Sequence, residues 1–234
     1  MARANTHKSS AEEPSKILEQ YGRSIIPRAA VVAIPYVGST IDVLLSGKAS
    51  RRWQERVMSL LDELRIRLGK IEESQIDKGF LSSDEFEQLI IRVFQALQSS
   101  HGHEKITYFA EILSKVATKG SPRDERAERY ITLVNELTGL HIRIIKLFAE
   151  RRESSLSKGR TEEIIIFGAK EISEILSVSQ EQIEAFCSDL VARSLLYDPQ
   201  LGLADYRRGS YALHPSAVPF TEFLNLSAAA QQGR

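Results

Sequence analysis

Residues 170–196, KEISEILSVSQEQIEAFCSDLVARSLL, contain the pattern that decides the fold of the C-terminal third of the chain. Their apolar residues recur every three or four positions in two runs, the spacing of one helix face. Ser179 can cap the second run, with Gln182 at the capping-box position. The sequence therefore predicts two short helices, at 169–176 and from 180 onward, joined by a turn. The second helix is expected to bury Ile183, Phe186, Cys187, Leu190 and Val191.

Short β-rich runs flank this helical pair. Residues 164–167 precede it, and residues 195–197 and 211–213 follow it around a loop at 198–210. A further helix is predicted at 139–152, where Thr138 can act as its N-cap. The polar residues 153–160, with three serines and Gly159, are expected to form a loop.

The predicted order of helix, strand, helix, turn, helix and two-stranded wing resembles the winged-helix fold. The stretch 170–196 resembles the helix-turn-helix core of that fold, and the resemblance covers residues 138–226. Winged helices include DNA-binding regulators and modules that bind only protein, so the fold does not fix a function.

Longer helical patterns occupy residues 14–137. Four helices are predicted, at 49–75, 82–98, 103–119 and 122–137. Ser82 and Glu85 can form the capping box of the second, and Gly120 ends the third. Ser121-Pro122 opens the fourth. The first helix has an apolar stripe of Trp53, Val57, Leu60, Leu64, Leu68 and Ile71. The expected fold class is mainly α: a helical bundle at 14–137, then a small winged-helix (α+β) domain at 138–226. Residues 1–13 are expected to be a disordered tail, and 227–234 a second tail.

An apolar segment at 24–45 precedes the bundle helices. Its central part, 29–41, carries no charge but is shorter than the roughly 20 residues that span a bilayer. We interpret it as a buried bundle helix; the alternative is a membrane-active element released from the bundle. The arrangement of IPYVGSTIDVLLSG (34–47), a charged amphipathic helix and a later winged helix resembles uncharacterised bacterial helical proteins, a resemblance that implies no activity.

Composition limits the possible partners and the compartment. Lysine plus arginine and aspartate plus glutamate number 31 each, so no overall field attracts nucleic acid or anionic lipid. The single cysteine, Cys187, cannot form an internal disulfide, and residues 1–14 show no secretory pattern. A cytoplasmic protein is expected.

The second helix of the predicted pair tests the DNA-binding interpretation. Its outward positions are Glu181, Gln182, Glu184, Ala185, Ser188, Asp189 and Ala192, three acids and no base. DNA affinity depends largely on basic contacts to phosphate, which this face lacks. We therefore expect a protein partner or a homo-oligomer, with nucleic acid disfavoured. The candidate partner-binding residues are Glu181, Gln182, Glu184, Asp189, Arg207 and Arg208.

Residues with catalytic or metal-binding potential are few. His101, His103 and Glu104 are interpreted as a surface turn rather than a metal site, because structural zinc needs four ligands. Cys187 lies on an apolar helix face and is interpreted as a buried thiol, and His141 as a surface or interfacial residue. With no phosphate-binding loop or catalytic motif, we expect no cofactor, no metal and no enzyme activity.

These observations favour a non-enzymatic protein-interaction or regulatory protein in which the winged helix binds protein or packs internally. Two alternatives remain open: a DNA-binding regulator, and a membrane-active effector that uses residues 24–45.

Overall fold

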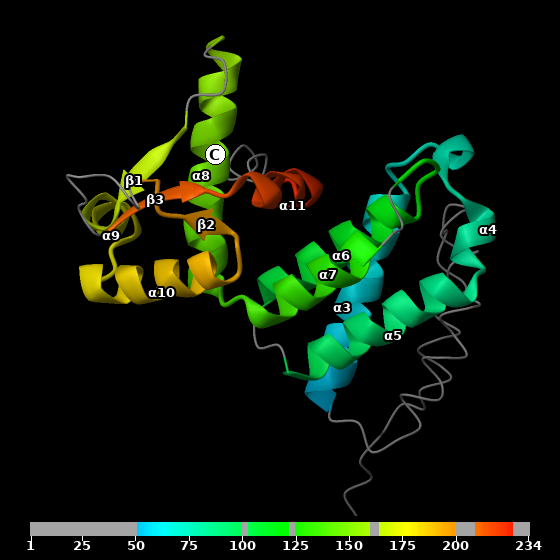
Figure 1. The fold of residues 1–234 in the computed structure, drawn as a ribbon. Coiled ribbons are helices and arrows are strands. Elements are labelled where there is room, and N and C mark those ends of the chain that lie inside the picture. Colours follow the sequence, from blue (N-terminus) through cyan, green and yellow to red (C-terminus); the bar gives the residue numbers. More distant parts are fainter. Residues whose placement is uncertain (1–50, 100–102, 122–124, 160–163, 200–208, 227–234) are drawn as a thin grey trace, which may run out of the picture.

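The computed structural model describes residues 51–99, 103–121, 125–159, 164–199 and 209–226. Within these ranges the protein is mainly helical, with a small antiparallel sheet near the C-terminus (Figure 1). The expected α-helical character is therefore confirmed. No described helix is both long and apolar enough to cross a membrane. The predicted tails, the segment 24–45, the Ser121-Pro122 helix opening and Arg207-Arg208 lie wholly or partly outside the described residues.

The first part of the described chain is a helical bundle (Figure 1). Its long helices are α3 (Arg51–Leu68), α5 (Asp84–Ser99), α6 (His103–Val116) and α7 (Glu125–Glu136), and its short ones are η1 (Glu73–Gln75) and α4 (Lys78–Leu81). Helix α3 packs along α6 and α5, and both of these contact α7. The apolar stripe predicted for α3 is buried from Trp53 to Leu68. Ile71, the last residue of that predicted stripe, lies beyond the end of α3 and is half-buried.

The boundaries of two bundle helices differ from the prediction. Helix α3 ends at Leu68 rather than near residue 75, because the chain turns to run beside the end of α6: the Asp77 amide donates to the Ala117 carbonyl at 2.9 Å, and the Lys119 amide donates to the Gln75 carbonyl at 2.8 Å. The same pairing stops α6 at Val116 rather than Lys119. The predicted Ser82 cap is also wrong by one residue, since the Phe86 amide donates to Ser83 Oγ at 3.3 Å.

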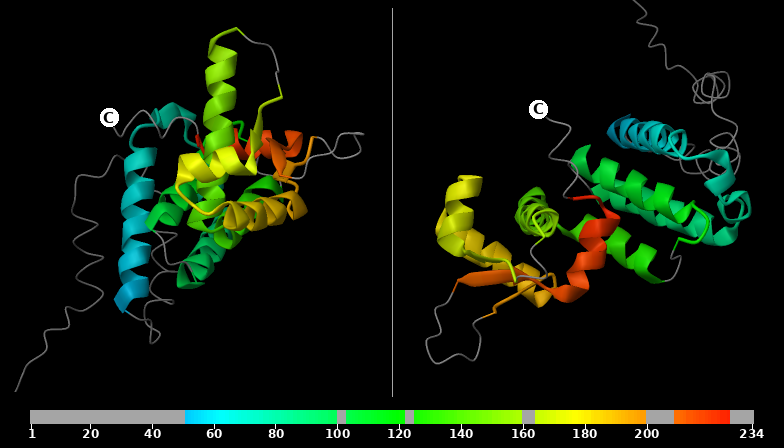
Figure 2. Two further views of the ribbon diagram at one scale, coloured as in Figure 1. Left: turned by 90° about the vertical axis from the view of Figure 1, so that its left-hand side faces the viewer. Right: turned by 90° about the horizontal axis from the view of Figure 1, so that it is seen from above.

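The second part begins with α8 (Gly139–Ser157) and continues through β1 (Ile166–Gly168), α9 (Ala169–Leu176), α10 (Gln180–Ala192), β2 (Leu196–Tyr197) and β3 (Ser210–Leu213). The strands form an antiparallel sheet of order β1-β3-β2. Phe167 of β1 is opposite Tyr211, and Leu196 of β2 is opposite Leu213. The 3-10 helix η2 (Pro215–Ala217) and the helix α11 (Val218–Phe223) follow. Viewed along its axis, α8 lies between the α9–α10 pair and α11 (Figure 2).

Local capping signals in this part are confirmed. Thr138 and His141 form the capping box of α8, and Ser179 Oγ accepts from the Gln182 amide at 3.4 Å. The predicted loop at 153–160 is wrong, because α8 continues to Ser157 and ends only before Gly159, whose φ is +72°. Val191 was expected inside but is 36% exposed, since Cys187 and Leu190 already fill the buried face of α10.

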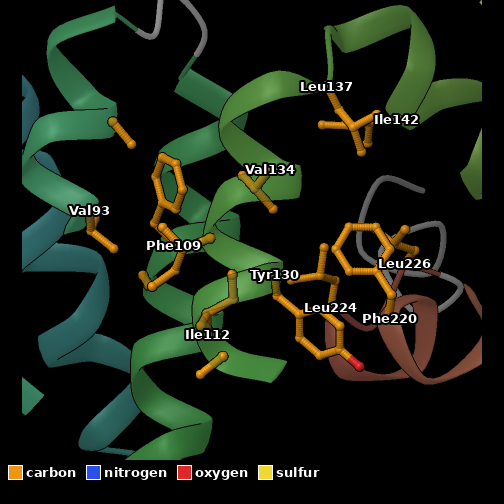
Figure 3. Packing of buried hydrophobic residues seen from close by; sticks show 14 of the residues in the cluster. Val93, Phe109, Ile112, Tyr130, Val134, Leu137, Ile142, Phe220, Leu224 and Leu226 are labelled. Atoms are coloured by element: carbon orange, nitrogen blue, oxygen red, sulfur yellow. The ribbon is translucent and has the colours of Figure 1, made fainter. Parts of the chain in front are cut away.

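The C-terminal segment joins the two parts of the fold. Tyr130 of α7 packs against the Phe220 and Phe223 rings at centroid distances of 5.3 and 5.1 Å. Figure 3 shows Phe220, Leu224 and Leu226 gathered against Tyr130. This docking places α11 between α8 and the bundle, so that one continuous apolar core runs through both parts.

A buried carboxylate strengthens this junction. Glu111 of α6 is 6% exposed and is paired with Arg67 of α3 and with Lys115, whose Nζ lies 3.1 Å from Glu111 Oε1. Asn225 Nδ2 donates to the same carboxylate at 2.7 Å. Lys115 Nζ in turn donates to the Phe223 carbonyl at 2.6 Å. The segment after α11 therefore completes the partners of a charge that would be costly to bury alone.

Trp53 provides a test of the bundle core. Its ring is 6% exposed, and its Nε1 donates to the Phe94 carbonyl at 3.3 Å. Trp53→Ala should lower the free energy of unfolding by about 3–5 kcal/mol, because it leaves a large cavity. The matched control is Ile66→Ala on the same helix, which removes a 47% exposed side chain and should change stability by about 0.5 kcal/mol or less. Trp53 is the sole tryptophan, so urea unfolding is followed by helical circular dichroism. Equal effects of the two substitutions would contradict burial of Trp53.

Candidate interaction surface

The predicted partner-binding residues separate into three groups. Glu181 and Gln182 are exposed on the first turn of α10, and the partly buried Glu184 accepts a hydrogen bond from Gln180 Nε2 at 2.8 Å. Asp189 instead contacts Arg193 and His141 of the same chain, although its side chain is 42% exposed. Arg207-Arg208 lie outside the described ranges. Helix α10 therefore presents an acidic N-terminal turn, and Asp189 belongs to a different cluster.

That cluster joins α7, α8 and α10. Asp189 Oδ2 accepts from Arg193 Nε at 3.0 Å, and Arg193 also pairs with Glu136 at the end of α7. Hydrogen bonds from these two carboxylates raise the pKa of Arg193 above its ordinary value, against the opposing effect of burial. The guanidinium, the only basic group of this helix end, is thus paired with two partly exposed carboxylates of the same chain.

His141 is buried beneath the cluster, with a side chain that is 8% exposed, rather than lying on the surface. Its ring packs against Phe186 at 4.5 Å between centroids. The Thr138 amide donates to Nδ1 at 3.1 Å, so the proton of the neutral ring is on Nε2. Nε2 lies 3.2 Å from Asp189 Oδ2 but outside hydrogen-bond geometry. Burial lowers the pKa of His141, with Asp189 opposing this change and Arg193 adding to it.

Cys187, and His214 after β3, have structural roles. Cys187 is fully buried, as predicted, and burial raises its thiol pKa to about 12. His214 Nδ1 accepts from the Ser216 amide at 3.2 Å and caps η2. No group of three or more potential metal ligands occurs among the described residues, although His101 lies outside them.

A groove that the sequence did not predict lies between the last turns of α8 and residues 164–166. It has two adjoining hollows that share Ser155, Ile164 and Ile165. The larger, about 420 Å³, is polar and also lined by Arg151, Ser154, Lys158 and Ile166. The smaller, about 260 Å³, is mainly apolar and reaches Phe148, Leu156, Tyr197 and Leu213.

The groove escaped prediction because residues 153–160 were interpreted as a loop. Because α8 in fact continues to Ser157, Arg151, Ser154, Ser155 and Lys158 lie on one face, spaced by three or four positions. This helical spacing was the signal in the sequence that could have revealed the α8 side of the groove. The facing segment 164–166 comes close only through the pairing of β1 with β3, which no local pattern specifies.

No protein-family model, no curated protein and no solved structure matches this chain significantly.

The buried His141 predicts a pH dependence of stability. Folding lowers the pKa of His141 below its unfolded value near 6.5. At a pH between the folded and the unfolded pKa, the unfolded state therefore binds more protons than the folded state. Protonation of His141 in the unfolded state therefore destabilises the fold as the pH falls below about 6.5, and this effect is absent at higher pH. His141→Gln keeps a capping-box residue and removes the titration. Urea unfolding at pH 7.5 and 5.5 should show a larger loss for the unchanged protein than for His141→Gln. Equal losses would contradict a buried neutral imidazole.

Proposed function

We propose that this chain is a non-enzymatic protein-binding protein whose residues 138–226 form a winged-helix module used for protein contact rather than DNA reading. The element order from α8 to β3, helix, strand, helix, helix, strand, strand, supports this assignment. The lone buried thiol of Cys187 supports a reducing compartment such as the bacterial cytoplasm.

The observation that carries the proposal is the chemistry of α10. In a DNA-reading winged helix this element would enter the major groove, where basic and amide side chains contact phosphates and bases. The exposed turn here carries Glu181 and Gln182, with Glu184 beside them. Arg193 is bound to Asp189 through Nε and to Glu136 through Nη1, so carboxylates of the same chain already offset its charge. An acidic helix face repels DNA but suits a basic or polar protein surface.

A gel-shift titration distinguishes the two uses of the module. The full chain should show no binding to duplex DNA tighter than roughly 10⁻⁵ M at physiological salt, within the range of weak non-specific affinity. Nanomolar affinity with a steep dependence on salt would instead establish the DNA-binding alternative.

Site-specific cross-linking tests the protein partner directly. A photoreactive amino acid at Gln182, exposed on α10, should give a discrete adduct with another protein in cells. The matched control is the same amino acid at Gln88, exposed on α5, which should give no such adduct. Adducts with nucleic acid, or the same adducts from both positions, would contradict the proposal.

A further inference from the structure

The groove beside α8 has an unusual share of exposed apolar surface. Among the described residues, the exposed large apolar side chains are Ile66, Leu156, Ile164, Ile166, Ile175 and Val191. Three of these six, Leu156, Ile164 and Ile166, border the groove, and Ile164 is 62% exposed. Scattered apolar residues need no explanation, but a cluster beside a hollow marks an interaction site.

The edge of β1 offers backbone hydrogen bonds at the same place. Strand β1 pairs with β3 on one side only and is an edge of the described sheet. The Ala169 amide donates to the Gly209 carbonyl at 2.7 Å. Because bonded and non-bonded pairs alternate in antiparallel strands, Phe167 is bonded to β3, whereas Ile166 and Gly168 direct their N–H and C=O groups to the opposite edge. An edge of this kind can pair with a further strand.

The charges of the groove select an acidic ligand. Arg151 and Lys158 form no ion pair with any described residue; Arg151 lies over the Phe167 ring at 5.9 Å. Arg152, one position along, is by contrast bound to Glu222 at 3.0 Å. Within the part of the chain that the structure describes, the larger hollow therefore has two cations without a carboxylate partner, and with the hydroxyls of Ser154 and Ser155 they can bind a carboxylate.

We propose that this groove binds an extended, acidic segment of a partner protein, which adds a strand to the free edge of β1. An apolar side chain of the segment enters the smaller hollow, and a carboxylate next to it meets Arg151 and Lys158. When a peptide adds a strand to a sheet, its main-chain hydrogen bonds supply affinity, and pockets for alternate side chains supply specificity. The edge strand β1, with one polar and one apolar hollow beside it, has both features. This inference rests on the proposed protein-binding function and assigns it a second surface, distinct from α10.

Fluorescence anisotropy with the full chain tests the ligand chemistry. The probe is a labelled eight-residue peptide that alternates glutamate and isoleucine, and its counterpart has lysine in place of glutamate. The acidic peptide should bind saturably, and the basic one at least tenfold more weakly. The double substitution Arg151→Glu and Lys158→Glu should weaken acidic-peptide binding at least tenfold. The matched control, Arg129→Glu with Lys70→Glu, reverses two exposed charges of the bundle and should leave binding unchanged.

Hydrogen exchange of the unchanged protein and one substitution, Ile166→Pro, test the strand pairing. Binding of the acidic peptide should slow exchange at the Ile166 and Gly168 amides and leave Phe167, already bonded to β3, nearly unchanged. Ile166→Pro removes the outward N–H from an edge position that tolerates proline and should weaken binding at least tenfold with little change in melting temperature. If Ile166→Pro lowers the melting temperature, the strand pairing is judged only from hydrogen exchange at Ile166, Phe167 and Gly168 in the unchanged protein.

Four results would overturn the inference. Equal binding of both peptides would remove the charge argument, and unchanged exchange at Ile166 and Gly168 would remove the strand pairing. Concentration-dependent dimerisation lost in Ile166→Pro would show that a second copy occupies the edge. Absence of acidic-peptide binding together with a persistent protein adduct at Gln182 would reject this groove and leave the proposed function intact.

Discussion

The buried carboxylate of Glu111 is the interaction on which the rest of the arrangement depends. A charge that is 6% exposed requires partners with well-defined geometry, because desolvation without them costs several kcal/mol. The partners come from α3, α6 and the segment after α11, through Arg67, Lys115 and Asn225. The C-terminal end of the described chain is therefore held against the bundle, and with it Phe220, Leu224 and Leu226.

This attachment positions α8 and hence the groove. The start of α8 is fixed by the Thr138–His141 capping box and by the contact of His141 with Phe186 of α10. Farther along, Arg152 is bound to Glu222 of α11, and Phe148 packs edge-on against Phe167 of β1 at 4.9 Å. Beyond these contacts the last turns of α8 face residues 164–166 without filling the space between them, so the two hollows remain.

The two candidate surfaces differ in chemistry. The first turn of α10 carries an acid, Glu181, and no base, because Arg193 lies at the opposite end of the helix, where it joins α10 to α7. Among the described residues, Arg151 and Lys158 of the groove form no ion pair, whereas Arg152 is bound to Glu222, the single carboxylate of α11. An acidic helix face and a basic, apolar groove support the proposed contacts with protein rather than with the uniformly negative surface of DNA.

Sequence by itself determined the features that depend on neighbouring residues. The stripe that buries Trp53, the caps at Thr138 and Ser179 and the burial of Cys187 follow from helical spacing and from side chains that bond within one turn. Only the tertiary structure decided the end of α3, the burial of His141, the pairing of Asp189 with Arg193 and His141, and the groove. These depend on contacts between distant positions: Arg67 meets Glu111 across 44 residues, and Asn225 meets it across 114. Periodicity carries no information about such pairs, because whether a polar side chain lies in solvent or against a partner is set by how the helices pack.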